Sequence, residues 1–234
     1  MDRPVALVSG GARGIGAAIA ARLMRDGWRV VVADQDAQGA APTGGRYVVC
    51  DVADEALVGS LIAGVAAHEG RLDALVCNAG IGIRKPIAQL TLAEWSQVIG
   101  TNLTSTFLLA RAGETMLRAA KGAVVTIAST RAHMSEADTE AYAASKGGLV
   151  SLTHALSISL APEVRVNCVS PGWIFTKSDM PRPEDHAFHP AGRVGTPDDV
   201  AALVAFLVGP DSGFVTGAEF IVDGGMTRKM IYPS

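Results

Sequence analysis

Charged side chains are scarce in this sequence. Only 18% of its 234 residues are Asp, Glu, Lys or Arg, and the formal net charge is -3. The hydrophobic share, 49%, is ordinary for a folded domain. Few charges with ordinary apolar content indicate a large buried interior and exclude intrinsic disorder as the main state. Nucleic-acid binding depends on a basic surface, so we expect no nucleic-acid partner.

Long apolar runs are also missing. The longest, 123–128 and 203–208, are far shorter than the ~20 residues that span a bilayer. An apolar run begins already at Val5, which leaves no room for a secretion signal before it. We therefore expect a cytoplasmic protein with no membrane segment.

Cysteine is rare and has no metal-binding pattern. Cys50, Cys77 and Cys168 each lie at the end of an apolar run, and their spacing is not that of metal ligands. We expect buried, reduced thiols. His186 and His189 form an H-x-x-H pair, but no third ligand stands at a suitable spacing, so no metal site is expected.

Short β-branched runs alternate with longer Ala/Leu-rich stretches of helical period. The predicted strands are 5–9, 29–33, 47–50, 74–77, 123–128, 165–169 and 219–222, and the predicted helical stretches are 15–26, 55–68, 92–120, 141–160 and 198–208. Strands that are apolar throughout are buried on both faces, as in parallel sheets between helical layers. The pattern predicts one domain over residues 1–234. Its fold would be a doubly wound, Rossmann-type α/β fold, with seven parallel strands and helices on both faces.

Small or polar residues follow every predicted strand. They include Ser9-Gly10-Gly11, Asp34, Asp51, Asn78-Ala79-Gly80, Ser129-Thr130, Ser170-Pro171-Gly172 and Asp223-Gly224-Gly225. Ligands of such sheets bind outside the carboxyl ends of the strands, where the strand order reverses, so we expect the site at this edge. The one long irregular stretch, 172–195, is predicted to be a mobile loop or lid beside the site.

Glycine is abundant, with 26 residues, and part of the excess lies in one turn. Gly10, Gly14 and Gly16 follow the first strand and open a helix, where small residues let the backbone approach a diphosphate at the positive end of the helix. Asp34 ends the second strand, where a carboxylate accepts hydrogen bonds from ribose hydroxyls and repels a 2′-phosphate. These residues predict NAD rather than NADP, although Arg13 favours a 2′-phosphate.

Several motifs in order resemble the short-chain dehydrogenase/reductase family over nearly the whole chain. They are the family's TGxxxGxG turn with Ser9 in place of Thr, Asp51, Asn78-Ala79-Gly80, Asn102, Ser129, the YxxxK pair Tyr142 and Lys146, Pro171-Gly172, Thr176 and Asp223-Gly224-Gly225. The resemblance implies catalytic Asn102, Ser129, Tyr142 and Lys146. Together with the glycine turn and Asp34, it implies a cofactor site of Gly10, Arg13, Gly14, Ile15, Gly16, Asp34, Asp51, Val52, Asn78, Ala79, Gly80, Tyr142, Lys146, Pro171, Gly172, Ile174 and Thr176.

The chemistry of the Tyr142 and Lys146 pair can be argued from their spacing. Residues four apart on a helix share one face. A phenol with a pKa of about 10 is a poor base at neutral pH, and a neighbouring ammonium lowers that pKa. Tyr142 would then serve as general acid/base for a secondary alcohol or ketone. By resemblance, Lys146 also binds the nicotinamide ribose, Ser129 orients the substrate oxygen and Asn102 holds a water.

Other interpretations remain open at this point. A helical Tyr and Lys pair is often only a surface contact, and the enzyme could be an NADP-dependent carbonyl reductase. A non-catalytic dinucleotide sensor or scaffold would keep the fold without turnover. Weaker candidates for contact with the substrate are Trp173, Phe188, Met180, Met134, Ile81, Ile83, Arg131 and His133. The resemblance also implies a homotetramer or homodimer, with the helix that contains Gly147 and Gly148 at one contact.

Overall fold

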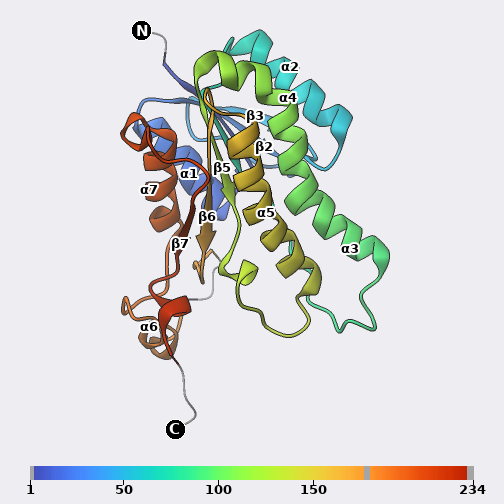
Figure 1. Cartoon of the computed structure of the whole chain (residues 1–234), viewed down its shortest axis with the longest axis vertical. Helices are drawn as coiled ribbons and strands as arrows, with labels where there is room; N and C mark the ends of the chain where they lie inside the picture. The colour runs from blue at the N-terminus through green and yellow to red at the C-terminus, as the bar shows by residue number, and fades with distance from the viewer. Residues whose placement is uncertain (1–2, 177–179, 231–234) are drawn as a thin grey trace.

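The computed structural model describes residues 3–176 and 180–230. Within them, seven parallel strands form one sheet in the order β3-β2-β1-β4-β5-β6-β7 (Figure 1). The strands are β1 (Val5–Ser9), β2 (Arg29–Asp34), β3 (Arg46–Val49), β4 (Ala74–Cys77), β5 (Ala123–Ile127), β6 (Arg165–Pro171) and β7 (Glu219–Val222). Strand ends differ from the predicted ones by at most two residues. The order reverses between β1 and β4, so the predicted Rossmann-type fold and single domain are confirmed.

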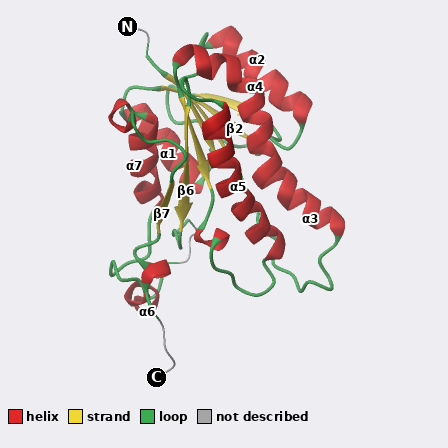
Figure 2. Cartoon of the chain, in the orientation of Figure 1, coloured by secondary structure: helices red, strands yellow, loops and turns green. Residues whose placement is uncertain are grey.

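Helices cover both faces of this sheet. On one face α1 (Gly14–Arg25) packs against α7 (Pro197–Val208), and on the other lie α2 (Glu55–His68), α4 (Ser105–Ala120) and α5 (Glu140–Ser159) (Figures 1 and 2). The shorter α3 (Leu92–Ile99) packs against α5, and α6 (Pro183–Phe188) lies beyond the ends of β6 and β7 (Figure 2). The sheet is therefore the middle layer of three.

Alternate residues of the inner strands face opposite cores. In β1, Val5 and Leu7 belong to the core that contains α2 and α4, while Ala6 and Val8 belong to the core that contains α1 and α7. This arrangement explains the continuous apolar runs, because an inner strand has no side that faces water. The edge strands β3 and β7 are mostly half-buried, so the expectation of full burial is wrong for those two.

The stretch 92–120, predicted as continuously helical, contains a change of helix type. α3 ends at Ile99, a π-helical turn covers Gly100–Thr104, and α4 follows. A π-helical turn changes the angular phase of the residues that follow it, and such turns are frequent at functional sites. Here the turn contains Asn102, which is 1% exposed. The apolar period on both sides of the turn hides it in the sequence.

Segment 172–195, predicted as irregular, contains ordered structure. Ile174 and Gly195 form a parallel β-bridge that joins the two ends of the segment. Helix α6 starts at Pro183, and at its N-terminus the Arg182 backbone N–H donates to Asp185 Oδ2 at 2.8 Å. The prediction of an irregular stretch is wrong for 183–188. Residues 177–179 lie outside the described residues, and the role of the segment as a lid stays a prediction.

The three cysteines are buried free thiols, as predicted. Burial raises the pKa of Cys50 to about 11 and that of Cys77 to about 12, so both are protonated at neutral pH. Of the helices in residues 3–176 and 180–230, none combines the length and the apolar character that crossing a membrane requires.

Candidate active site

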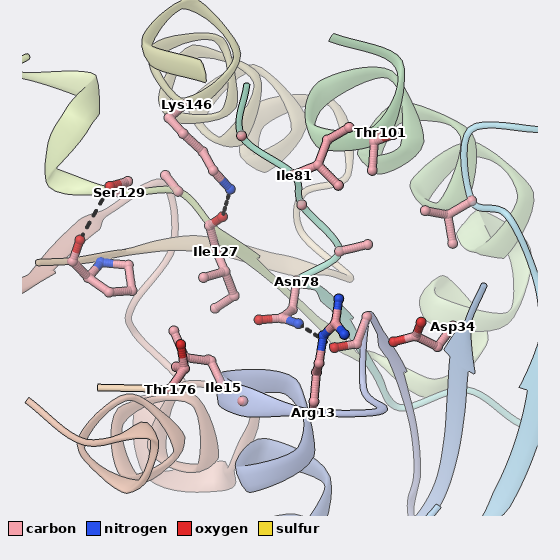
Figure 3. A pocket seen from close by; sticks show the side chains of 18 of the residues that line it. Arg13, Ile15, Asp34, Asn78, Ile81, Thr101, Ile127, Ser129, Lys146 and Thr176 are labelled. Atoms are coloured by element: carbon pink, nitrogen blue, oxygen red, sulfur yellow. Dashed lines mark hydrogen bonds between the residues drawn. The ribbon is translucent and has the colours of Figure 1, made fainter. Parts of the chain in front are cut away.

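A cavity of about 960 Å³ opens at the carboxyl edge of the sheet, next to the reversal between β1 and β4. Connections that follow six of the strands contribute to its lining. Figure 3 shows Arg13 and Asp34 at one end of this cavity and Ser129 and Lys146 at the other. Every predicted site residue lines the cavity except Gly16 and Asn102.

The glycine turn brings the backbone of β1 close to the segment after β4. Gly10 has φ +64°, and a Cβ on it would lie 2.6 Å from the Cα of Ala79. A Cβ on Gly16 would overlap the carbonyl oxygen of Gly10. Both positions therefore require glycine. The first backbone N–H groups of α1 have no partner within the helix, and the glycine turn beside them lets a diphosphate come close to them.

Ser9 and Asn78 hold these two segments together. The Ser9 Oγ accepts the backbone N–H of Asn78 at 3.0 Å and that of Ala79 at 3.2 Å. The Asn78 side-chain amide donates to the carbonyls of Ser9 and Gly10 at 3.1 and 2.8 Å. The Ser9 hydroxyl thus joins the two segments at the position where the short-chain dehydrogenase/reductase motif has Thr. Asn78 maintains the shape of the turn.

Asp34 lies at the end of β2, half-buried at the cavity rim. Its carboxylate accepts the backbone N–H of Ala12 at 3.0 Å and that of Asp36 at 3.1 Å. The first bond ties Asp34 to the glycine turn. Each carboxylate oxygen still has capacity for another hydrogen bond, so this residue can accept from ribose hydroxyls. Asp51 and Val52 line the same end of the cavity.

Ser129, Tyr142 and Lys146 meet at the other end of the cavity. Ser129 is the N-cap of a 3₁₀ turn, Thr130–Ala132, that follows β5. Lys146 is 4% exposed, and its Nζ donates to the Ile127 carbonyl at 2.8 Å (Figure 3). The same Nζ lies 5.5 Å from the centre of the Tyr142 ring. The predicted shared face of Tyr142 and Lys146 is present.

The protonation energetics differ from the sequence-based expectation. Burial raises the pKa of Tyr142, while a hydrogen bond with Ser129 and the charge of Arg131 lower it in part. Burial also lowers the pKa of Lys146 to about 8. The expectation that Lys146 lowers the Tyr142 pKa is therefore wrong in this structure. The ammonium is directed at the Ile127 carbonyl, and desolvation of the phenol outweighs the stabilising contacts.

Asn102 lies one layer behind the cavity. Its Oδ1 accepts the Ile81 backbone N–H at 2.8 Å, and its amide nitrogen donates to the Ile81 carbonyl and to Ser145 Oγ, each at 2.9 Å. A Cβ on Gly80 would lie 3.4 Å from Lys146 Nζ and 3.5 Å from Asn102 Oδ1. Asn102 thus fixes the segment after β4 beside Lys146, and the π-helical turn gives it this position.

Some residues that line the cavity were not predicted from the sequence, and some predicted substrate contacts lie outside it. The missed ones are Ala33, Gln35, Cys50, Gly82, Thr101, Ile127 and Ala128. Most of them end a strand or follow one. They could have been predicted from the rule that ligands of parallel sheets bind at the carboxyl ends of the strands. Of the weaker substrate candidates, only Ile81 lines the cavity; Trp173, Phe188, Met180, Met134, Ile83, Arg131 and His133 do not.

The two loop histidines have structural contacts. His189 is 3% exposed, and its Nδ1 is 2.8 Å from the Asp185 carbonyl oxygen. His186 Nδ1 accepts the Val194 backbone N–H at 3.2 Å. In the part of the chain that the structure describes, no group of three His, Cys, Asp or Glu side chains is arranged to hold a metal.

Comparison with known proteins identifies the family. Residues 10–227 match the family described as enoyl-(acyl carrier protein) reductase. An uncharacterized oxidoreductase of Thermotoga maritima is 44% identical, with 99% of each chain covered. The chain belongs to the short-chain dehydrogenase/reductase family. It is therefore an oxidoreductase of a family that uses an NAD(P) dinucleotide.

Two further members of this family have names that state an activity. A D-threitol dehydrogenase of Mycolicibacterium smegmatis is 39% identical, covering 98% of this chain and 95% of its own. The solved structure of the aldohexose dehydrogenase of Thermoplasma acidophilum, in ligand-free form, is 29% identical with a TM-score of 0.93, covering 99% of this chain and 97% of its own.

Proposed function

We propose that this chain is an NAD-dependent dehydrogenase that interconverts a secondary alcohol and a ketone. The observation that carries the proposal is one cavity with two chemically different ends. One end has the glycine turn and Asp34, which suit a dinucleotide. The other has Ser129, Tyr142 and Lys146, which suit proton transfer. A site that only bound a dinucleotide would not need a phenol and a buried ammonium together.

In this proposal Tyr142 moves the proton. During oxidation its phenolate oxygen takes the hydroxyl proton of the alcohol, and during reduction its phenol returns a proton to the ketone oxygen. The bound dinucleotide supplies the hydride acceptor or donor. Ser129 hydrogen-bonds the reacting oxygen and orients it toward Tyr142.

Lys146 and Asn102 support this step. The Lys146 ammonium is buried, with its Nζ 5.5 Å from the centre of the Tyr142 ring and donating to the Ile127 carbonyl. We also assign to Lys146 a hydrogen bond to the nicotinamide ribose. Asn102 holds the Ile81 segment in place and, in this proposal, binds a water that links Lys146 to solvent.

The cofactor preference follows from Asp34. A 2′-phosphate near this carboxylate would meet like charge at close range, whereas ribose hydroxyls would donate to it. Arg13 lines the same end of the cavity and is the observation that favours the alternative, an NADP-dependent carbonyl reductase. We give Asp34 more weight, because its position is fixed by the Ala12 N–H.

The test is a panel of secondary alcohols, including sugar alcohols such as D-threitol and also aldohexoses, with NAD or NADP, read by absorbance of the reduced cofactor. We expect turnover with NAD and a kcat/KM for NAD at least about tenfold above that for NADP. Asp34→Ala should reduce this ratio. Asp36→Ala removes an exposed carboxylate two residues away and should leave the ratio unchanged.

Two results of this panel would contradict the proposal. Higher kcat/KM with NADP would favour the carbonyl reductase. No turnover with either cofactor, while NAD still binds by calorimetry, would favour a dinucleotide sensor or scaffold. We further propose that the chain assembles as a homotetramer or homodimer, which a monomer mass by light scattering would refute.

A further inference from the structure

Arg131 connects the two segments that carry Ser129 and Tyr142. Its backbone N–H donates to Ser129 Oγ at 3.2 Å, within the turn that follows β5. Its guanidinium donates to Thr139 Oγ1 at 3.4 Å. Thr139 is the N-cap of α5, and Tyr142 lies in the first turn of that helix. Arg131 therefore links the start of the connection after β5, through its backbone, to the end of that connection, through its side chain.

Glu136 fixes the guanidinium in this place. Its Oε2 lies 2.8 Å from Arg131 Nη2, and its backbone carbonyl accepts the Thr139 hydroxyl at 2.7 Å. Arg84, from the connection after β4, reaches the same carboxylate at 3.3 Å. The Arg131 side chain is 27% exposed, against 66% for Arg84. Arg131 is thus the more sheltered of the two cations and the one tied to α5.

The charge of Arg131 acts on the Tyr142 phenol. Burial raises the pKa of Tyr142, and Arg131 is the cation that lowers it among the residues that the structure describes. Lys146 is held instead by the Ile127 carbonyl. Shelter from water strengthens the effect of Arg131, because a charge interaction weakens as the surrounding dielectric rises.

Other charged or titratable groups lie on the elements packed around Tyr142. They are Lys146 and Glu140 on α5, His133, Glu136 and Asp138 on the connection after β5, Arg84 and Lys85 on the connection after β4, Glu94 on α3, and Arg165 and Cys168 on β6. Two of them neutralise each other, since Lys85 pairs with Glu94 at 2.8 Å. His133 pairs with Glu219 on β7 at 2.8 Å. Arg131 and Glu136 are the pair tied to the helix start.

We propose that Arg131 is a positioning residue for the acid–base pair: it ties the Ser129 turn to the N-cap of α5 and places a positive charge at the start of the helix that carries Tyr142. This inference rests on the proposed function of Tyr142. Alcohol oxidation needs the phenolate, and a fixed cation favours that form. The ion pair with Glu136 partly neutralises the charge of Arg131, which weakens its effect on Tyr142, and it keeps the guanidinium in one orientation.

The test is the pH profile of NAD-dependent alcohol oxidation at saturating NAD. In the wild type, kcat/KM rises with pH as Tyr142 loses its proton. In Arg131→Gln the pKa of Tyr142 should rise, which moves this limb to higher pH by about half to one unit and lowers kcat/KM about three- to tenfold below the limb. The loss should shrink at higher pH. Arg131→Lys keeps the charge and should keep the limb near its wild-type pH.

Arg22→Gln is the matched control. Arg22 lies in the last turn of α1, has a side chain 35% exposed and pairs with Asp26 at 2.8 Å, so the substitution removes a similar ion pair far from Tyr142. Its profile should match the wild type. An Arg131→Gln profile that is unshifted, or lower by one factor at every pH, would overturn the proposal. So would an Arg131→Lys profile shifted as far as that of Arg131→Gln.

A second readout does not depend on turnover. The chain has three tyrosines, so the ultraviolet difference titration of a protein against its Tyr142→Phe counterpart isolates the Tyr142 phenol. The pH midpoint of the Tyr142 titration should be higher in the Arg131→Gln protein than in the protein with Arg131, by about half to one pH unit. An unchanged midpoint would overturn the role of Arg131. Failure of the proposed function is a separate result: Tyr142→Phe would then keep its activity whatever the midpoint.

Discussion

Lys146 is a charged side chain buried at the site. The side chain is 4% exposed, its Nζ donates to the Ile127 carbonyl, and no carboxylate among the described residues forms an ion pair with it. Burial of the ammonium lowers its pKa to about 8 from an ordinary 10.5. Burial of this ammonium therefore destabilises the folded chain.

Replacing this lysine should stabilise the chain while it removes activity. Between pH 8 and about 10.5 the unfolded chain holds more protons at this position than the folded chain, so this group makes stability rise with pH in that window. Lys146→Met should thus raise the free energy of unfolding by roughly 1–2 kcal/mol at pH 7, after the loss of the Ile127 hydrogen bond is counted. Urea unfolding at several pH values measures it.

The gain should fade as pH rises from 8 toward 10.5. Lys121→Met is the control, because Lys121 is an exposed C-cap of α4 and its removal should leave the pH dependence of stability unchanged. A wild type more stable than Lys146→Met at pH 7, or a gap that widens with pH, would contradict this account.

At the scale of elements, the junction of β1 and α1 leaves no space for side chains. Gly16 lies in the first turn of α1, and a Cβ there would overlap the Gly10 carbonyl oxygen, a backbone atom that cannot move alone. Gly59 lies inside α2, is exposed and has no atom within 4 Å of its Cβ position. A side chain is therefore excluded at Gly16 and tolerated at Gly59, although both glycines are inside helices.

Alanine at these two positions should have opposite effects. Gly16→Ala should push α1 away from the turn and weaken NAD binding by about tenfold or more, since the N–H groups at the helix start would move. Gly59→Ala should raise the free energy of unfolding by about 0.5–1 kcal/mol and leave binding unchanged, because alanine restricts the unfolded chain and favours the helix. Calorimetric titration with NAD and thermal unfolding distinguish them. Wild-type NAD affinity in Gly16→Ala would sink the interpretation.

Element boundaries were predictable where apolar periodicity ends sharply, and not elsewhere. The inner strands could be recognised because burial on both faces leaves a continuous apolar run. The π-helical turn at Gly100–Thr104 could not, because its extra residue does not interrupt the apolar pattern of α3 and α4. The short helix at 183–188 has no buried residue, so no periodicity revealed it.

At the scale of the whole molecule, the position of the site could be predicted from the polar residues that follow the strands. Polar residues after parallel strands converge at one edge, and the cavity lies there. The electrostatics of Tyr142 could not be predicted in this way. They depend on the direction of two side chains: Lys146 points to Ile127, and Arg131 points to the start of α5. Packing of the connections sets those directions, and sequence spacing does not record it.

The proposed function depends on Tyr142, which would carry the proton in an NAD-dependent alcohol oxidation. The most direct measurement compares kcat of the wild type and of Tyr142→Phe, which keeps the ring and removes only the hydroxyl. We expect kcat to fall by about 10²–10⁴, the usual contribution of a general acid/base, with NAD affinity and thermal stability near those of the wild type. Wild-type kcat in Tyr142→Phe would contradict the claim.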